Sequence, residues 1–308
     1  MSLVGLSDLE QLRSKMYSAN RFLHFTVIVS KVLFWCFAAM FCYGALMNIM
    51  PALSLGFLFA LVCLLVAGSV DTFRYSKLLK YKKEIKQKVY KIIFEDVNDF
   101  EYESMTDSKV SELFGKLQEL NLFGSFSRLV CDDCFVYKSD DITCKIYDIG
   151  VYNIATGYKT KITRKIFEGM LIVSPSFKKF SGVTVIKADK KLKTIEDIST
   201  SLERINFEDV VFEKFFDVYS TDQIEARYLL TTAFMERLVN SVSKEGKQIV
   251  GSFEKGNVYI GVESKEDLFE LDLSKPLTDK DTFVPLIEEL KQAAELVKAL
   301  KLENKTGM

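Results

Sequence analysis

Two uncharged apolar runs near the N-terminus dominate the hydropathy pattern of this chain. They cover residues 32–50 and 52–70, and only the short stretch Asn48 to Pro51 divides them. At a rise of 1.5 Å per residue, each run forms a helix of about 28 Å, close to the hydrocarbon thickness of a bilayer. Backbone polar groups in lipid have to be satisfied within the segment, which requires helices. The pattern therefore predicts a transmembrane helical hairpin over residues 32–70.

Basic residues flank this predicted hairpin and indicate its orientation. Arg13, Lys15 and Arg21 precede the first run, the loop between the runs is uncharged, and Glu84 is the only acid in residues 74–91. Cytoplasmic flanks of membrane spans carry an excess of Lys and Arg, so both termini are expected in the cytoplasm. The basic residues after the second run are Arg74, Lys77, Lys80, Lys82, Lys83, Lys86, Lys88 and Lys91.

Two other interpretations of the apolar runs are a buried hairpin and a signal peptide. A buried hairpin in a soluble core is disfavoured by two adjacent runs of membrane length with basic flanks. A cleaved signal peptide is disfavoured because the first run starts late and a second one follows. Neither run contains Asp, Glu, Lys or Arg. Transport pathways use such groups inside the membrane, so a pore or a pump is not expected.

The polybasic juxtamembrane segment after the hairpin has two readings that remain open. It forms either a solvated stalk helix or an amphipathic helix that lies against anionic lipid headgroups, where each cation contributes about 1 kcal/mol. The residues expected to contact headgroups are Arg74, Lys77, Lys80, Lys82, Lys83 and Lys86.

Beyond this segment the hydrophobic period predicts a cytosolic α+β domain. Helical spacing of apolar residues indicates helices over 107–120 and 282–302. Strands are expected where β-branched and aromatic residues cluster, and Ser220 with Gln223 is expected to start a helix as a capping box. A hairpin is predicted around residues 254–257. The predicted strands are 135–137, 143–147, 150–154, 165–173, 182–186, 215–219, 249–253 and 258–262.

The predicted fold class is thus a membrane-anchored α+β protein, a two-helix hairpin followed by a mixed, largely antiparallel domain. Its expected parts are a cytosolic N-terminal segment (1–31), the hairpin (32–70), basic and amphipathic helices (71–121), the α+β domain (122–302) and a tail (303–308).

Composition narrows the candidate chemistry. The net charge of −1 makes nucleic acid a poor expected partner. Cys131 and Cys134 have the spacing of a zinc or redox pair, but only Cys144 offers a third thiolate and the single histidine, His24, lies near the membrane. Ordinary strand cysteines are therefore expected, without a disulfide, metal or cofactor, although a metal or redox role for these three cysteines is left open. Scattered acids such as Glu168 and Glu213 leave an acid–base enzyme as the alternative.

Several stretches resemble a bacterial family of uncharacterised inner-membrane proteins of unknown function. They are Phe167–Met170, Phe180–Thr184, Asp267–Glu270 and above all residues 207–237, within a resemblance that extends over residues 75–300. The block at 207–237 combines a phenylalanine-rich strand, a Tyr-Ser-x-Asp-Gln helix start and an Ala-Arg-Tyr-Leu-Leu-Thr turn. The resemblance implies a multi-pass protein of the bacterial inner membrane with a cytosolic domain. It implies no activity, cofactor or catalytic residue.

Within that block, Asp222, Glu225 and Arg227 either cap and brace a helix or line a binding surface. We expect a non-enzymatic binding or scaffold module whose partners are the lipid bilayer and another protein. The alternatives are a membrane-associated hydrolase or transferase that uses acidic residues, and an accessory subunit of a transport assembly. The oligomeric state is not predicted.

Overall fold

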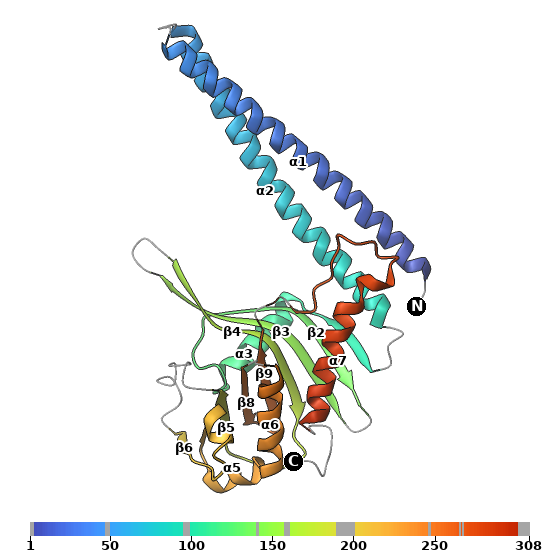
Figure 1. Cartoon of the computed structure of the whole chain (residues 1–308), viewed down its shortest axis with the longest axis vertical. Helices are drawn as coiled ribbons and strands as arrows, with labels where there is room; N and C mark the ends of the chain where they lie inside the picture. Colours follow the sequence, from blue (N-terminus) through green and yellow to red (C-terminus); the bar gives the residue numbers. More distant parts are fainter. Residues whose placement is uncertain are drawn as a thin grey trace. The chain divides into compact units, whose positions relative to one another are not determined.

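A computed structural model of the 308-residue chain describes residues 3–46, 50–94, 99–139, 142–156, 161–188, 201–245, 248–264, 266 and 268–300. The chain divides into two compact units (Figure 1). One comprises residues 1–93 and 272–282, and the other residues 94–271 and 283–308. Residues 47–49, which include part of the predicted turn between the apolar runs, lie outside the described residues. The predicted tail at 303–308 lies entirely outside them.

Two long helices make up most of the first unit. Helix α1 (Leu3–Leu46) and helix α2 (Met50–Phe94) run side by side as a hairpin (Figure 1). Phe37 and Phe59 stack across it with ring centroids 5.0 Å apart. Both helices extend well beyond the apolar runs: α1 includes the predicted N-terminal segment, and α2 includes the polybasic segment. The first of the helices predicted over 71–121 is the end of α2, which stops at Phe94.

The second unit is built on a nine-stranded sheet with the order β1-β2-β3-β4-β9-β8-β5-β7-β6. All paired strands are antiparallel, whereas the sequence analysis predicted a mixed, largely antiparallel domain. The strands are β1 (Phe100–Ser104), β2 (Arg128–Lys138), β3 (Thr143–Thr156), β4 (Lys161–Pro175), β5 (Thr184–Ala188), β6 (Glu203–Ile205), β7 (Phe216–Ser220), β8 (Ile249–Glu254) and β9 (Asn257–Glu263).

Helices cover both faces of this sheet. Helix α3 (Asp107–Gln118) packs Leu113 and Leu117 on one face, against Cys134 and Phe167 among others. On the opposite face, Phe234 of helix α6 (Thr232–Glu245) lies 5.8 Å from Phe253 of β8, between ring centroids. Helix α7 (Val284–Ala299) covers this same face near β4 and β9. The remaining helices are α4 (Phe212–Phe215), α5 (Gln223–Leu229) and η2 (Lys280–Thr282).

The α+β fold class is confirmed, and several local predictions differ from the structure. The expected strands 143–147 and 150–154 form one continuous strand, β3. Strand β1 was not predicted. Helix α5 begins at Gln223 with Asp222 as its N-cap, so the predicted capping box from Ser220 was wrong. Ser220 instead ends β7, where its hydroxyl shares a hydrogen bond of 2.9 Å with that of Thr184.

Candidate functional site

The polybasic part of α2 holds all six residues that were expected to contact headgroups. Arg74 donates to the Asp71 carboxylate at 2.7 Å and to the Asn20 amide oxygen at 3.2 Å. Lys77, Lys80, Lys82 and Lys83 are exposed, while Ile85, Val89 and Tyr90 on the same helix are buried. Exposed cations, with the exposed apolar residues Leu79 and Tyr81 among them, thus precede a stretch of α2 whose apolar residues are mostly buried.

A segment from late in the chain packs on the cationic end of this hairpin. Residues 272–282, here called the strap, belong to the same compact unit as α1. The Glu10 carboxylate accepts a hydrogen bond of 2.8 Å from the Leu277 N–H, and Arg13 donates to the Leu273 carbonyl at 3.1 Å. Leu6 and Leu277 are completely buried. Nothing local in the sequence indicated this contact.

The polar residues expected at a binding surface on α5 are engaged with the main chain around them. Asp222 accepts from the N–H groups of Ile224 and Glu225, which caps the helix. Glu225 in turn accepts from Ser181 N–H at 2.8 Å and Gly182 N–H at 2.7 Å. Both carboxylates therefore form structural hydrogen bonds, as the interpretation that these residues cap and brace a helix predicts.

Arg227 is held in a similar way, and it ties α5 to the preceding loop. Its guanidinium donates to the Asn206 carbonyl at 3.0 Å and lies over the Phe207 ring, 5.4 Å from the centroid. It remains solvent-exposed. A binding role for Asp222, Glu225 and Arg227 stays a prediction.

Apolar side chains on α5 are the feature that sequence reasoning missed. Ile224 is 83% exposed and Tyr228 53% exposed, one turn apart on the outer side of a helix whose Ala226 and Leu229 are buried. Lys178 lies against this face, with its ammonium 4.6 Å from the centroid of the Tyr228 ring. We call Ile224, Arg227, Tyr228 and Lys178 the α5 surface. Their i and i+4 spacing, opposite to the buried positions, was the signal available in the sequence.

The cysteine pair lies inside the sheet and not at an exposed site. A β-bulge in β2 between Cys131 and Asp133 breaks the alternation, so Cys131 and Cys134 both enter the core under α3. Burial raises the pKa of the Cys134 thiol to about 12 and also raises that of Cys131. Thiols with such pKa values are protonated at neutral pH and react slowly. Among the described residues, no three His, Cys, Asp or Glu side chains are arranged to hold a metal ion.

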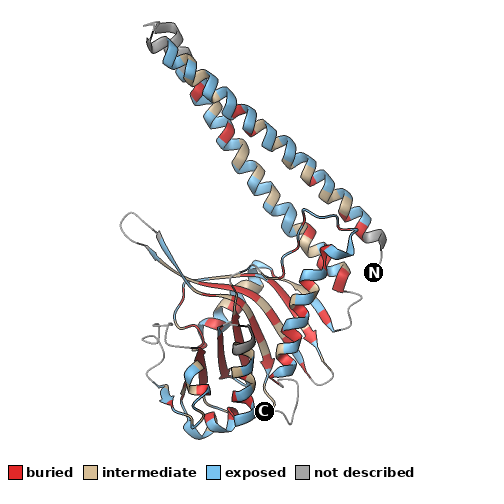
Figure 2. Cartoon of the chain, in the orientation of Figure 1, coloured by how far each residue is buried: buried red, intermediate tan, exposed pale blue. Residues whose placement is uncertain are grey.

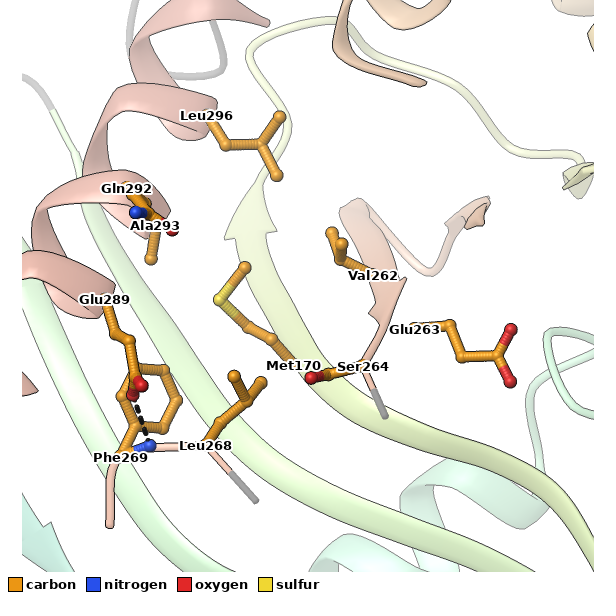
Figure 3. Close-up of a pocket in the computed structure, with 10 residues that line it drawn as sticks. All are labelled: Met170, Val262, Glu263, Ser264, Leu268, Phe269, Glu289, Gln292, Ala293 and Leu296. Carbon is orange, nitrogen blue, oxygen red and sulfur yellow. Dashed lines mark hydrogen bonds between the residues drawn. The ribbon is translucent and has the colours of Figure 1, made fainter. Parts of the chain in front are cut away.

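Two hollows in the second unit are candidate ligand sites. The first lies between α7 and the β4–β9 surface and encloses about 40 Å³ (Figure 3). Met170, Val262 and Leu296 give it apolar walls. At its edge the Glu289 carboxylate accepts a 2.5 Å hydrogen bond from Phe269 N–H, which holds Phe269 at a φ of 55°. This volume has room for only a few water molecules.

The second hollow is an acidic cleft of about 340 Å³ beside the bulge in β2. Asp132, Asp148, Glu168 and Glu266 line it together with Tyr152. The Tyr152 hydroxyl donates to Glu168 at 2.9 Å, and hydrogen bonds from Lys165 and Tyr152 lower the pKa of Glu168. A general acid needs the opposite shift, so Glu168 is suited to remain ionised. Of the scattered acids named from the sequence, only Glu168 lies in this cleft.

The comparisons with known proteins include a family match within the C-terminal half of the chain. Residues 165–302 match a family described as a protein of unknown function (DUF3137). No curated protein matches the chain. Among solved structures, the crystal structure of the mycobacterial trehalose monomycolate transport factor A, TtfA, is similar with a TM-score of 0.36 and 8% identity. The alignment covers 70% of this chain and 94% of that one. At this level the similarity carries no functional argument.

The family match overlaps the expected resemblance but covers less of the chain. It includes all three short stretches and the distinctive block at 207–237, and it begins within β4. The α5 surface residues all lie inside the matched range. The helical hairpin lies outside it.

Proposed function

We propose that this protein is a membrane-anchored binding module whose α+β domain engages another protein on the cytosolic side. The observation that carries the proposal is the exposure of the hairpin's apolar surface. The most apolar windows of α1 and α2 have mean hydropathies of 2.0 and 1.8, yet only 11% and 6% of their residues are buried (Figure 2). A core helix of a soluble protein would be mostly buried.

The exposed side chains on the hairpin would be costly in water. Trp35 is 71% exposed, Leu65 62% and Phe57 60%. Leaving a large apolar side chain in water instead of burying it costs about 1.5–3 kcal/mol. A lipid environment removes this cost for the whole surface at once, which supports anchoring by both helices. The basic flanks support cytoplasmic termini, and the resemblance supports a bacterial inner membrane.

Lipid headgroups are the proposed partner of the exposed cations of α2. Lys77, Lys80 and Lys83 are exposed and lie within about four turns of the end of the apolar run. Anionic headgroups attract cations placed at this position. These cations would add to the anchoring by the apolar helices.

The α5 surface is the proposed contact with a protein partner. Exposed apolar side chains that gather on one helix are typical of docking sites, and charged rims add specificity. Ile224 and Tyr228 supply the apolar centre, while Arg227 and Lys178 lie beside it. The described hydrogen bonds of Asp222 and Glu225 fix the helix that presents these side chains.

Anchoring is tested by fractionation of cells that express the full chain. We expect the protein in the membrane fraction after alkaline carbonate washing and in solution only after detergent. A reporter fused to either terminus should report the cytoplasm. Release by carbonate, or an external reporter signal, would contradict the proposal.

Partner binding is tested separately with a photo-crosslinking amino acid at position 224. A matched variant carries it at position 162, where the native Ile162 is 63% exposed on another part of the domain. We expect a discrete adduct from position 224 that is lost on Tyr228→Ala. Identical adducts from both positions, or none from either, would count against the α5 surface.

A further inference from the structure

Strands β3 and β4 continue past the rest of the sheet as a two-stranded ribbon. Strand β2 begins at Arg128, opposite Tyr152, and strand β9 ends at Glu263, opposite Gly169. The pairs from Asn153 with Arg164 to Thr156 with Lys161 therefore have no third strand beside them in the described part of the chain (Figure 1). We call residues 153–156 and 161–165 the ribbon, with Lys165 at its base opposite Tyr152. Isolated two-stranded ribbons are marginally stable in water.

The base of the ribbon is fixed to the domain. Asn153 donates from its side-chain amide to the Ser125 carbonyl at 3.2 Å, and Ile154 N–H donates to the Ser127 hydroxyl at 2.7 Å. These bonds satisfy groups that a third strand would otherwise pair. The ribbon is thus held rigidly at one end while it extends beyond the sheet.

The charged residues of the ribbon are all cations, and the ribbon also carries an exposed apolar side chain. The sequence contains no acid between Asp148 and Glu168 but four cations, at positions 159, 161, 164 and 165. Arg164 and Lys165 are exposed, and Ile162 beside them is 63% exposed. Lys165 pairs with Glu168 at 2.8 Å, whereas no ion pair of Arg164 is found among the described residues.

We propose that this ribbon contacts an anionic lipid bilayer, with Ile162 entering the headgroup region and Arg164 and Lys165 binding lipid phosphates. An aliphatic side chain amid cations fits the boundary between headgroups and acyl chains, where both groups gain free energy. Nucleic acid would use the cations but offers no apolar site for an isoleucine at its phosphate backbone. The chain's two apolar helices independently favour lipid.

This inference rests on the proposed anchoring for its bilayer, but it assigns a second contact to the globular domain. Its test uses the full chain in nanodiscs, with Trp35→Phe to remove the single native tryptophan and Ile162→Trp as the reporter. The discs contain either phosphatidylcholine alone or phosphatidylcholine with about one-third phosphatidylglycerol. Brominated lipids quench tryptophan only when it reaches the acyl boundary.

We expect quenching at least threefold stronger in anionic than in neutral discs, and weaker at high salt because exposed charges are screened. Arg164→Gln with Lys165→Gln should remove most of that difference. The matched control is Ile224→Trp, an apolar site on α5 that is more exposed than Ile162, which should remain unquenched in both discs.

Three results would overturn the inference. One is equal, weak quenching at positions 162 and 224. Another is quenching that ignores lipid charge and the two Gln substitutions. The third is an emission change with added single-stranded RNA or polyglutamate but none with brominated lipid, which would assign a different partner. Failure of the chain to enter nanodiscs at all would instead refute the anchoring proposal, so the two failures are distinguishable.

Discussion

The Glu10 carboxylate accepts a hydrogen bond of 2.8 Å from the main-chain N–H of Leu277, a residue 267 positions later in the chain. The same carboxylate pairs with Arg13, which reaches the Leu273 carbonyl. The start of α1 and the strap, far apart in the sequence, therefore meet in the unit that holds the helical hairpin. The strap leaves the domain after Leu271 and returns to it at Phe283. The strap is therefore followed directly by Phe283, the residue before α7.

Removing the Glu10 carboxylate should loosen the strap. A hydrogen bond to a charged group contributes about 1.5–3 kcal/mol, and Glu10 is mostly buried, so Glu10→Ala should raise hydrogen exchange at Leu277 by about tenfold or more. The control is Glu84→Gln, which removes an exposed pair with Lys88. Exchange at Leu277 that is equal in the two variants would show that Glu10 does not hold the strap.

The same carboxylate predicts a dependence on acid. The hydrogen bond from Arg13, with a smaller contribution from Leu277 N–H, lowers the pKa of Glu10 below its ordinary value of 4.5. A lowered folded-state pKa stabilises the fold above about pH 4.5, and this stabilisation is lost as pH falls through the folded-state value. Protection of Leu277 N–H should therefore decline below about pH 4.5 in the native protein. It should be insensitive to pH over that range in Glu10→Gln.

Two glycines in the family-like motifs should resist substitution for steric reasons. Gly169 has a φ of 146°, and a Cβ there would overlap the carbonyl oxygen of Val262 on β9. A Cβ at Gly182 would lie 2.6 Å from both the Glu225 carboxylate and the Thr221 hydroxyl. Gly169→Ala should lower the unfolding midpoint more than Gly182→Ala, because main chain yields less than side chains. Gly115→Ala, where a Cβ meets open space on α3, is the control and should stabilise slightly.

The helices and central strands were predictable because each has a clear hydrophobic period. Helix α3 and the β8–β9 hairpin match their predicted ranges closely. Strand β1 was missed because Glu101 and Glu103 are poor strand formers, and its pairing with β2 determines its conformation. Asp148 interrupted the strand prediction for β3, although it is buried within that strand. The conformations of β1 and β3 depend on pairing with strands that are distant in sequence.

The candidate surfaces were predictable only in part, for the same reason. The cations of α2 follow from local pattern, and the structure leaves Lys77, Lys80, Lys82 and Lys83 exposed. On α5 the sequence pointed to polar residues, and the structure shows Glu225 and Arg227 hydrogen-bonded to main-chain groups of the same domain. The exposure of Ile224 depends on which face α5 packs against the domain. A single sequence does not specify that face for a seven-residue helix.

The buried cysteines should be inert in the folded protein. Because burial raises the pKa of Cys134 to about 12 and raises that of Cys131 as well, both thiols are protonated at pH 8. Iodoacetamide should label them at least a hundredfold more slowly than a free thiol, and labelling should recover in denaturant. A raised folded-state pKa also means that stability is full below about pH 9 and falls as pH rises further. Fast labelling at pH 8, measured by peptide mass spectrometry, would contradict the buried arrangement.

Substitution on α5 separates docking from folding. Ile224→Asp places a charge where the native side chain is 83% exposed, so the free energy of unfolding should change by less than about 0.5 kcal/mol. Asp222→Ala removes the N-cap of the same helix and should cost about 1 kcal/mol. If α5 docks a partner, Ile224→Asp abolishes co-purification while Asp222→Ala weakens it only as far as the helix frays. Co-purification that follows stability alone would assign the α5 residues to the fold and leave the docking surface elsewhere on the domain.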